Sequence, residues 1–500
     1  ANYAEIDGLP VIDNKKIARD LLRDQMEFEG MLTSDGAAVL KSYNYFKVAD
    51  SYYEAGLLAK KAGCDTEIPV GASFRNLPNY VKSGELDEAL LDESVRRILT
   101  IKFKRGLFEN PYCEIEKLEE ALMNTEKEKV SRKIAQESLV LLKNDGILPL
   151  KKEEIHTIGI IGPNANSRNS LIGNYHGTSS EYITVLEGIR EEAGDDVRIL
   201  YSQGCDLYKD KVENLAWDQD RISEAVITAE NSDVVILCVG LDETLEGEEG
   251  DTGNSDASGD KVDLHLPKVQ EELIEKVTAV GKPTIVVLMA GSAIDLNYAQ
   301  DNCNGILLAW YPGARGGRAV ADLLFGKESP SGKLPVTFYK DLEGMPEFTD
   351  YSMKNRTYRY MEKEALYPFG YGLTYSDTCV TEAEVVGEVS AESDIMLKAT
   401  VKNNGTVDTD EVVQVYIKDL DSPLAVRNYS LCGFKRVSLK AGEEKSVEFT
   451  ISNKAMNIVD EDGNRYIAGK HFRLFAGVSQ PDTRSAELTG HKPAEVEIAL

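Results

Sequence analysis

The chain has 500 residues, a formal net charge of −29 and a sequence pI of about 4.7. This length is enough for about three domains of ordinary size. The acidic balance argues against nucleic acid or an anionic membrane surface as a partner, and the absence of an apolar run of about 18 residues predicts no membrane-spanning helix.

Residues 1–110 predict alternating strands and helices, which is typical of a parallel sheet. The expected strands are 31–34 and 64–68, and the expected helices are 17–28, 46–62 and 86–103. A closed eight-stranded α/β barrel needs about 250 residues. We therefore interpret 1–110 as the C-terminal part of a (β/α)8-type barrel, and we expect the full-length chain or another polypeptide to supply the missing barrel half.

Asp35 follows the first of these predicted strands directly and precedes Gly36. Barrels and open α/β sheets place their chemistry at the carboxyl ends of parallel strands. This position makes Asp35 a candidate catalytic carboxylate.

Residues 111–154 predict a charged helical connector that ends in a strand near 141–142, and residues 155–340 predict an α/β/α sandwich. Near-continuous apolar runs are typical of buried parallel strands, and five occur here, at 157–161, 197–201, 234–239, 283–289 and 305–309. Residues 341–379, rich in Pro, Gly and Tyr, predict a linker.

The segment 240–251 follows the predicted strand 234–239 and carries six carboxylates, among them Glu246 and Glu248. Crowded carboxylates repel one another, which raises some of their pKa values, and a carboxyl group that stays protonated near neutrality can act as a general acid. A solvated acidic loop or a cation site is the alternative interpretation of this composition.

Residues 380–500 switch to alternating apolar and polar positions, which predicts a β-sandwich. Its clearest strands are 395–401, 412–417, 445–451 and 472–475, separated by turns such as Asn404-Gly405 and Asp462-Gly463.

The seven cysteines are scattered without C-x-x-C spacing, and no two of the five histidines stand at ligand spacing. This pattern favours free thiols in a reducing compartment and predicts no metal site.

Two carboxyl groups are the machinery of glycoside hydrolysis, where one attacks the anomeric carbon and the other protonates the leaving oxygen. Asp35 and the acidic loop could form such a pair. They lie on different predicted domains, so this pairing predicts a site at a domain interface.

Taken in order, several motifs make the whole chain resemble glycoside hydrolase family 3 in its three-domain form. These motifs are TSD (33–35), AGCD (62–65), LFENPY (107–112), LKNDG (142–146), AWYPG (309–313), PSGKLP (330–335), YPFGYGL (367–373) and GFKRV (433–437). The resemblance implies that the last domain is fibronectin-III-like.

The resemblance also implies a retaining, exo-acting β-glycosidase that needs no cofactor, most simply a β-glucosidase or β-xylosidase. Asp35 matches the family's nucleophile, and Glu248 matches its acid/base, with Glu246 as the alternative. Tyr3, Gly36 and Asp65 are expected to bind substrate, which would be an oligosaccharide or an aryl or alkyl β-glycoside.

Two departures from the family pattern qualify this expectation. Gly36 stands where many β-glucosidases have Trp, which predicts a differently shaped sugar pocket. No part of the chain matches the early-barrel Asp, Arg, Lys-His and Arg that grip the terminal sugar. Because such contacts orient the substrate and stabilise the transition state, we expect this chain alone to be nearly inactive.

Other interpretations remain open at this point. The chain could be a non-catalytic carbohydrate-binding relative, or resemble β-N-acetylglucosaminidases, which use an Asp-His acid/base from the barrel. We expect a bacterial cytoplasmic protein, because the cysteine pattern favours a reducing compartment, and a homodimer is compatible with the sequence.

Overall fold

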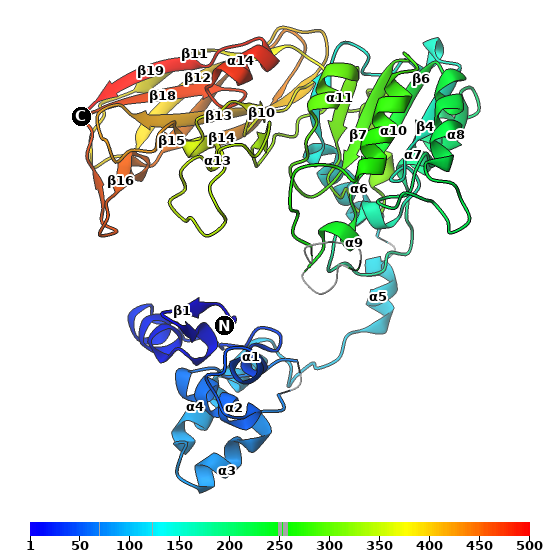
Figure 1. Cartoon of the computed structure of the whole chain (residues 1–500). Helices are drawn as coiled ribbons and strands as arrows, with labels where there is room; N and C mark the ends of the chain where they lie inside the picture. The colour runs from blue at the N-terminus through cyan, green and yellow to red at the C-terminus, as the bar shows by residue number, and fades with distance from the viewer. Residues whose placement is uncertain (70, 123, 249–252, 254–258) are drawn as a thin grey trace. The chain divides into compact units, whose positions relative to one another are not determined.

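The computed structural model describes residues 1–69, 71–122, 124–248, 253 and 259–500 (Figure 1). The chain forms two compact units, Ala1–Asn124 and Thr125–Leu500. Among the described residues, no helix has the length and apolar character needed to cross a membrane.

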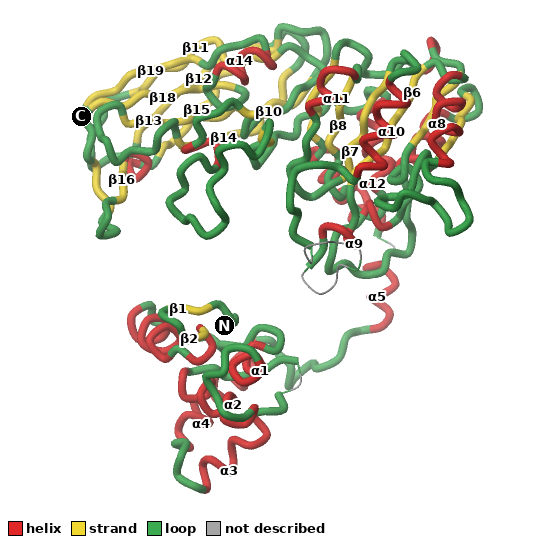
Figure 2. Tube along the Cα trace, viewed as in Figure 1, coloured by secondary structure: helices red, strands yellow, loops and turns green. Residues whose placement is uncertain are grey.

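The N-terminal unit consists mostly of helices and loops (Figure 2). Its core is built by Ile12, Val39, Ala55, Ala59 and Cys64. Its elements are β1 (Glu5–Ile6), β2 (Leu9–Pro10), η1 (Val11–Asp13), the π-helical η2 (Lys16–Gln25), α1 (Ala38–Asn44), α2 (Tyr52–Ala62), η3 (Phe74–Asn76), α3 (Leu77–Lys82), α4 (Glu88–Lys104) and α5 (Ile115–Leu122).

The parallel sheet expected in this unit is reduced to one parallel bridge, between Thr33 and Thr66. The segments 31–34 and 64–68 have only each other as strand neighbours among the residues described in this unit. Two strands alone are marginal, because most of their backbone groups lack a ladder partner. The prediction of two full strands here was therefore wrong in extent, although the parallel direction was right.

The predicted helix 46–62 was wrong in its first residues. Helix α2 begins at Tyr52, because the hydroxyl of Ser51 accepts a hydrogen bond from the N–H of Glu54 at 3.1 Å and caps the helix. Lys47, with a φ of 58°, breaks helical geometry before that point. Gly63 ends α2 in a left-handed conformation, as expected. The short α1 was not predicted.

The second unit is built on a six-stranded sheet with the order β3-β8-β7-β6-β4-β5. All neighbours are parallel except β3, which pairs antiparallel with β8. Residues 140–144, expected at the end of the connector, thus form an edge strand of this sheet. The strands are β3 (Val140–Asn144), β4 (Thr157–Ile161), β5 (Arg198–Ser202), β6 (Val234–Gly240), β7 (Thr284–Met289) and β8 (Gly305–Leu308).

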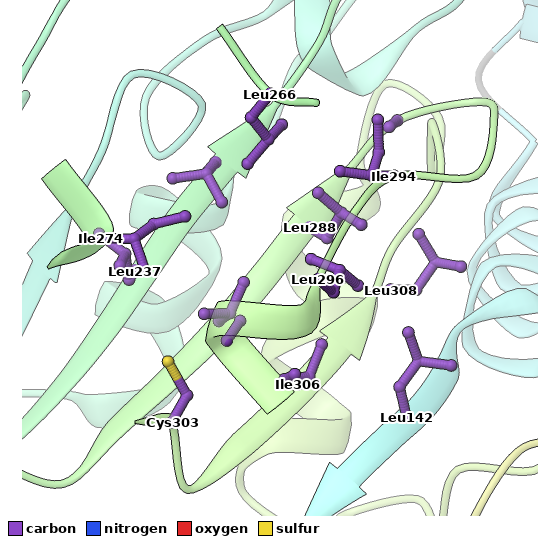
Figure 3. Packing of buried hydrophobic residues seen from close by; sticks show 14 of the residues in the cluster. Leu142, Leu237, Leu266, Ile274, Leu288, Ile294, Leu296, Cys303, Ile306 and Leu308 are labelled. Atoms are coloured by element: carbon purple, nitrogen blue, oxygen red, sulfur yellow. The ribbon is translucent and has the colours of Figure 1, made fainter. Parts of the chain in front are cut away.

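Successive residues of the central strands enter different cores on the two faces of the sheet. Leu237 packs with residues of α8, α10 and α11, whereas Ile236 packs with residues of α7 and α12. Figure 3 shows the first core, where Leu237, Leu288 and Leu308 point to the same face. Because both faces are covered, the strands are apolar throughout, which is why they stood out in the sequence.

The helices of this α/β/α sandwich are α6 (Thr125–Ser138), η4 (Lys152–Glu154), η5 (Asn169–Leu171), α7 (Val185–Ala193), α8 (Asp220–Glu230), α9 (Glu243–Glu246), α10 (Lys268–Thr278), α11 (Asn297–Asn302) and α12 (Gly316–Leu324). A segment with β9 (Phe338–Tyr339), α13 (Thr357–Tyr360) and β10 (Ala365–Tyr367) follows.

The last part of the second unit is a β-sandwich of two antiparallel sheets, ordered β11-β12-β15 and β14-β13-β18-β19. Alternate residues such as Leu397, Val415 and Leu474 fill its core. The remaining elements are β11 (Thr378–Val386), β12 (Ile395–Asn403), β13 (Thr409–Asp419), β14 (Ser430–Leu439), β15 (Glu444–Ile451), η6 (Asn453–Met456), β16 (Asn457–Val459), β17 (Arg465–Ile467), β18 (His471–Gly477), α14 (Thr483–Thr489) and β19 (Ala494–Ala499).

Candidate active site

Asp35 is exposed and lies two residues beyond the Thr33–Thr66 bridge. Its backbone is fixed on both sides. The N–H of Ser34 donates to the carbonyl of Thr66 at 2.9 Å, and the N–H of Ala38, at the start of α1, donates to the carbonyl of Asp35 at 3.1 Å. The N–H of Gly36 donates to Oδ1 of Asp35 at 2.7 Å. A rigid backbone therefore presents a solvent-accessible carboxylate.

Gly36 is also exposed, and a Cβ built on it would meet no atom within 4 Å. Tyr3 packs against the core cluster that contains Ile12 and Ala38. The ammonium of Lys41 lies 3.6 Å from the centre of the Tyr3 ring, which is a cation–π contact. Of the predicted substrate-binding residues, Gly36 thus lies at the surface of the N-terminal unit and Tyr3 is partly buried in it.

Asp65, also predicted to bind substrate, has a completely buried side chain. Oδ2 accepts hydrogen bonds from Arg23 at 2.8 Å and from the N–H of Leu32 at 2.9 Å. Oδ1 accepts from Arg97 at 3.0 Å and from the hydroxyl of Ser94. Burial alone would raise the pKa of Asp65, but these hydrogen bonds and the two guanidinium groups lower it below its ordinary value.

The Asp65 carboxylate therefore joins the segment before Asp35 to η2 and α4. In the structure it supports the backbone that carries Asp35.

In the second unit, the acidic segment follows β6, as predicted, and its first residues form the short helix α9. Asp242 caps this helix, because Oδ1 accepts from the N–H of Thr244 at 2.9 Å and from its hydroxyl at 2.6 Å. The carboxyl end of β6 lies beside β4 at the point where the strand order reverses. Open α/β sheets bind ligands at such a point.

Glu246 ends α9, and its carboxylate is engaged within the unit. Oε2 accepts from the hydroxyl of Tyr311 at 2.5 Å and from the N–H of Gly291 at 2.7 Å. Burial, and then the Glu246 carboxylate, raise the pKa of Tyr311 well above its ordinary value. Lys261, whose pKa burial lowers, also lies within electrostatic range of Glu246.

Glu248, two residues further on, is exposed. Its backbone N–H donates to Oδ1 of Asn174 at 3.3 Å. On the same loop, Glu243 Oε2 lies 2.9 Å from Nε2 of His176. Hydrogen bonds to the Gly177 carbonyl and to Glu243 raise the pKa of His176. The other acidic residues of this loop, Glu249 and Asp251, lie outside the described residues.

Four residues that hold this loop were not among the predicted site residues, namely Asn174, His176, Gly291 and Tyr311. Gly291 and Tyr311 do follow predicted strands and belong to short Gly-rich segments. A polar residue just beyond a buried apolar strand is the signal that could have indicated Tyr311. Asn174 and His176 lie in an irregular segment that carries no comparable signal.

Comparison with protein-family models matches three segments of the chain. The glycosyl hydrolase family 3 N-terminal domain matches residues 1–101, the family 3 C-terminal domain matches 139–375, and the fibronectin type III-like domain matches 411–480.

Three relatives span nearly the whole chain. A β-xylosidase of Formosa agariphila is 32% identical over 97% of this chain and 68% of its own length. A periplasmic β-glucosidase of Salmonella typhimurium is 31% identical over 95% of this chain and 65% of its own length. The solved structure of β-glucosidase EmGH1 from Erythrobacter marinus matches with a TM-score of 0.86 and 32% identity, over 100% of this chain and 67% of that one.

The chain belongs to glycoside hydrolase family 3. It combines part of the family's N-terminal domain, an α/β sandwich with a six-stranded mixed sheet, and a fibronectin-III-like β-sandwich, which confirms the predicted fold class. The chain spans about two-thirds of the length of these three relatives.

Proposed function

We propose that this chain carries the two catalytic carboxyl groups of a retaining, exo-acting β-glycosidase. In this proposal Asp35 is the nucleophile and Glu248 is the acid/base, with Glu246 as the alternative for the second role. The observation that carries the proposal is the exposed Asp35, held on a fixed backbone in a chain of family 3. Relatives named as a β-xylosidase and a β-glucosidase support the substrate class, a terminal β-linked xylose or glucose.

The proposed reaction is a double displacement. An oxygen of Asp35 attacks the anomeric carbon while the bond from that carbon to the leaving oxygen breaks, and Glu248 gives its proton to that oxygen. Water then attacks the anomeric carbon of the glycosyl-enzyme and releases the Asp35 carboxylate. Glu248 takes the proton of this water, which returns both groups to their starting states.

The compartment belongs to the proposal as well. Seven free cysteines support a reducing compartment such as the bacterial cytoplasm. The Salmonella relative is named as a periplasmic protein, so cell fractionation followed by immunodetection is the measurement that decides.

A 2-deoxy-2-fluoro-β-glycoside with a good leaving group tests the nucleophile. It forms the glycosyl-enzyme but slows its hydrolysis, so the label accumulates on the attacking residue. We expect peptide mass mapping of the full-length gene product to find the label on Asp35. The variant Asp35→Asn should lose turnover of aryl glucosides and xylosides by about 10⁴-fold or more, because the covalent intermediate can no longer form.

The matched control is Asp50→Asn, which changes another exposed aspartate of the same unit and should leave the rate unchanged. Near-normal turnover by Asp35→Asn, or a label on another residue, would refute the assignment. Sugar binding without turnover would favour a carbohydrate-binding protein, and turnover of N-acetylglucosaminides alone would favour the hexosaminidase-like alternative.

A further inference from the structure

Two candidates for the acid/base, Glu246 and Glu248, lie two residues apart on the loop after β6, but their surroundings differ. Oε2 of Glu246 accepts two hydrogen bonds, from the hydroxyl of Tyr311 at 2.5 Å and from the N–H of Gly291 at 2.7 Å. Gly291 follows β7, and Tyr311 follows β8. One carboxylate oxygen thus ties the end of α9 to the carboxyl ends of the next two strands.

The other oxygen of Glu246, Oε1, is enclosed and has no hydrogen-bond partner among the described residues. A general acid must bring its carboxyl group within hydrogen-bond reach of the glycosidic oxygen. With Oε2 occupied by two donors and Oε1 covered, Glu246 could reach a substrate only after the loop has come away from the strands.

The packing around this contact leaves little freedom. A Cβ built on Gly291 would lie 3.0 Å from Cε2 of Tyr311 and 3.4 Å from Oε2 of Glu246. A side chain at position 291 would therefore crowd both partners. The high pKa of Tyr311 keeps its hydroxyl protonated, so it remains a donor at every physiological pH.

Glu248 has the opposite arrangement. Its residue is exposed, while its backbone N–H is fixed to Asn174 at 3.3 Å. The contact between Glu243 and His176 holds the loop at a third point. The backbone that leads to this accessible side chain is thus restrained up to Glu248 itself, which suits a group that must be placed and still reach a ligand.

We propose that Glu246 is a positioning residue, which anchors the loop through Tyr311 and Gly291, and that Glu248 is the proton donor that this anchor places. This inference rests on the proposed glycosidase function for the role of Glu248. The anchor itself is a property of the second unit and is measured without any activity.

The anchor is tested by hydrogen exchange with mass spectrometry on the peptide that covers residues 241–248, in the whole chain. Tyr311→Phe removes one hydroxyl and keeps the ring, and it should speed exchange of this peptide about tenfold, because a charge-assisted hydrogen bond is lost. Glu246→Gln should have a similar effect. Glu248→Gln is the matched control and should exchange like the wild type. Unchanged exchange in Tyr311→Phe would overturn the anchor.

The two roles are separated by kinetics on the full-length gene product. Glu248→Ala should lose the acidic limb of the pH–rate profile, turn over dinitrophenyl glycosides far better than phenyl glycosides, and form a β-glycosyl azide when azide is added. Tyr311→Phe and Glu246→Gln should both lower kcat. Both variants should keep the acidic limb of the pH–rate profile and form no glycosyl azide. Azide rescue of Glu246→Ala, without rescue of Glu248→Ala, would overturn the assignment. A wild type without turnover would overturn the glycosidase function, while the exchange result would still decide the anchor.

Discussion

Two buried aspartates of the N-terminal unit, Asp65 and Asp13, differ in their hydrogen-bond partners, and therefore in the charge state that stabilises the fold. Asp65 is enclosed, yet both its oxygens accept hydrogen bonds from cationic or neutral donors. Asp13 is also buried, but neither of its oxygens has a well-formed hydrogen bond among the described residues. The first carboxylate stabilises the fold when charged, and the second stabilises it only when neutral.

For Asp65, removing the charge should destabilise the N-terminal unit. Asp65→Asn leaves Arg23 and Arg97 without their carboxylate, and breaking a buried ion pair in this way typically costs about 3–5 kcal/mol. The loss of stability is measured by unfolding the chain in urea and using limited proteolysis within residues 1–122 to detect the unfolded N-terminal unit. The exposed Asp92→Asn on α4 is the control, and an equal loss in both variants would contradict the role of Asp65.

For Asp13, stability should depend on pH. Burial raises its pKa from 3.8 to about 6, and the nearby Ser42 hydroxyl offsets only part of this. Between these values the native state holds a proton that the unfolded state has released. The free energy of unfolding should therefore fall as the pH rises from about 4 to 6, by up to about 3 kcal/mol.

In Asp13→Asn this part of the pH dependence should disappear, and the variant should be more stable than the wild type above pH 6. Urea titrations of the N-terminal unit at a series of pH values provide the measurement. The exposed Asp24→Asn serves as the control. A wild-type profile that is flat from pH 4 to 6 would show that Asp13 is already paired.

At the scale of elements, helices α7 and α12 approach each other through glycines. A Cβ on Gly188 would lie 2.1 Å from the carbonyl oxygen of Gly317, and a Cβ on Gly317 would lie 1.9 Å from the carbonyl oxygen of Thr184. Backbone atoms cannot yield as a flexible side chain can. The glycines therefore set the distance between these helices on one face of the sheet.

Gly188→Ala should accordingly destabilise the second unit, by about 1–3 kcal/mol or more. The direction of the change in unfolding free energy is informative, because Gly→Ala inside a helix with free space around it stabilises the protein by about 1 kcal/mol. Thermal unfolding of the whole chain gives the measurement. Gly177→Ala, where an added Cβ meets no atom within 4 Å, is the control, and a stabilised Gly188→Ala would contradict the close approach.

Strands were predicted best from the sequence where both faces of the sheet are buried, because such strands are continuous apolar runs. Strand β4 was predicted at its observed bounds, and β6 within one residue. The prediction of full strands in the N-terminal unit was wrong, because a strand needs neighbouring strands to pair with. The segment 31–34 has only one bridge partner among the described residues. In the same way, the spacing of Glu246 and Glu248 could not show that their surroundings differ, since Gly291 and Tyr311, which contact Glu246, follow strands far along the chain.

At the scale of the whole molecule, a buried ion pair joins the two layered parts of the second unit. Lys333 Nζ lies 2.7 Å from Oε1 of Glu411 on β13, and the two side chains are 8% and 1% exposed. Oε2 of Glu411 accepts from the hydroxyl of Thr378 at 2.6 Å. The segment that follows α12 is thereby fixed to the β-sandwich.

Glu411→Gln should weaken this connection by about 3–5 kcal/mol, because it leaves the Lys333 charge buried and unpaired. The exposed pair of Glu384 and Lys398, 3.2 Å apart within the β-sandwich, is the control. Glu384→Gln should cost no more than about 1 kcal/mol. Urea unfolding, with hydrogen exchange of β13 as the local readout, compares the two variants, and equal losses would contradict the prediction.

One further consequence follows from the thiols. All seven cysteines lie in the described part of the chain, and Cys113, just ahead of α5, is the exposed one. A maleimide dye should therefore label the native protein at this single position without any engineered cysteine. Cys113 lies eleven residues before the boundary of the two compact units in the chain, so the emission of such a dye would report in solution whether the surroundings of this segment change when a sugar is added.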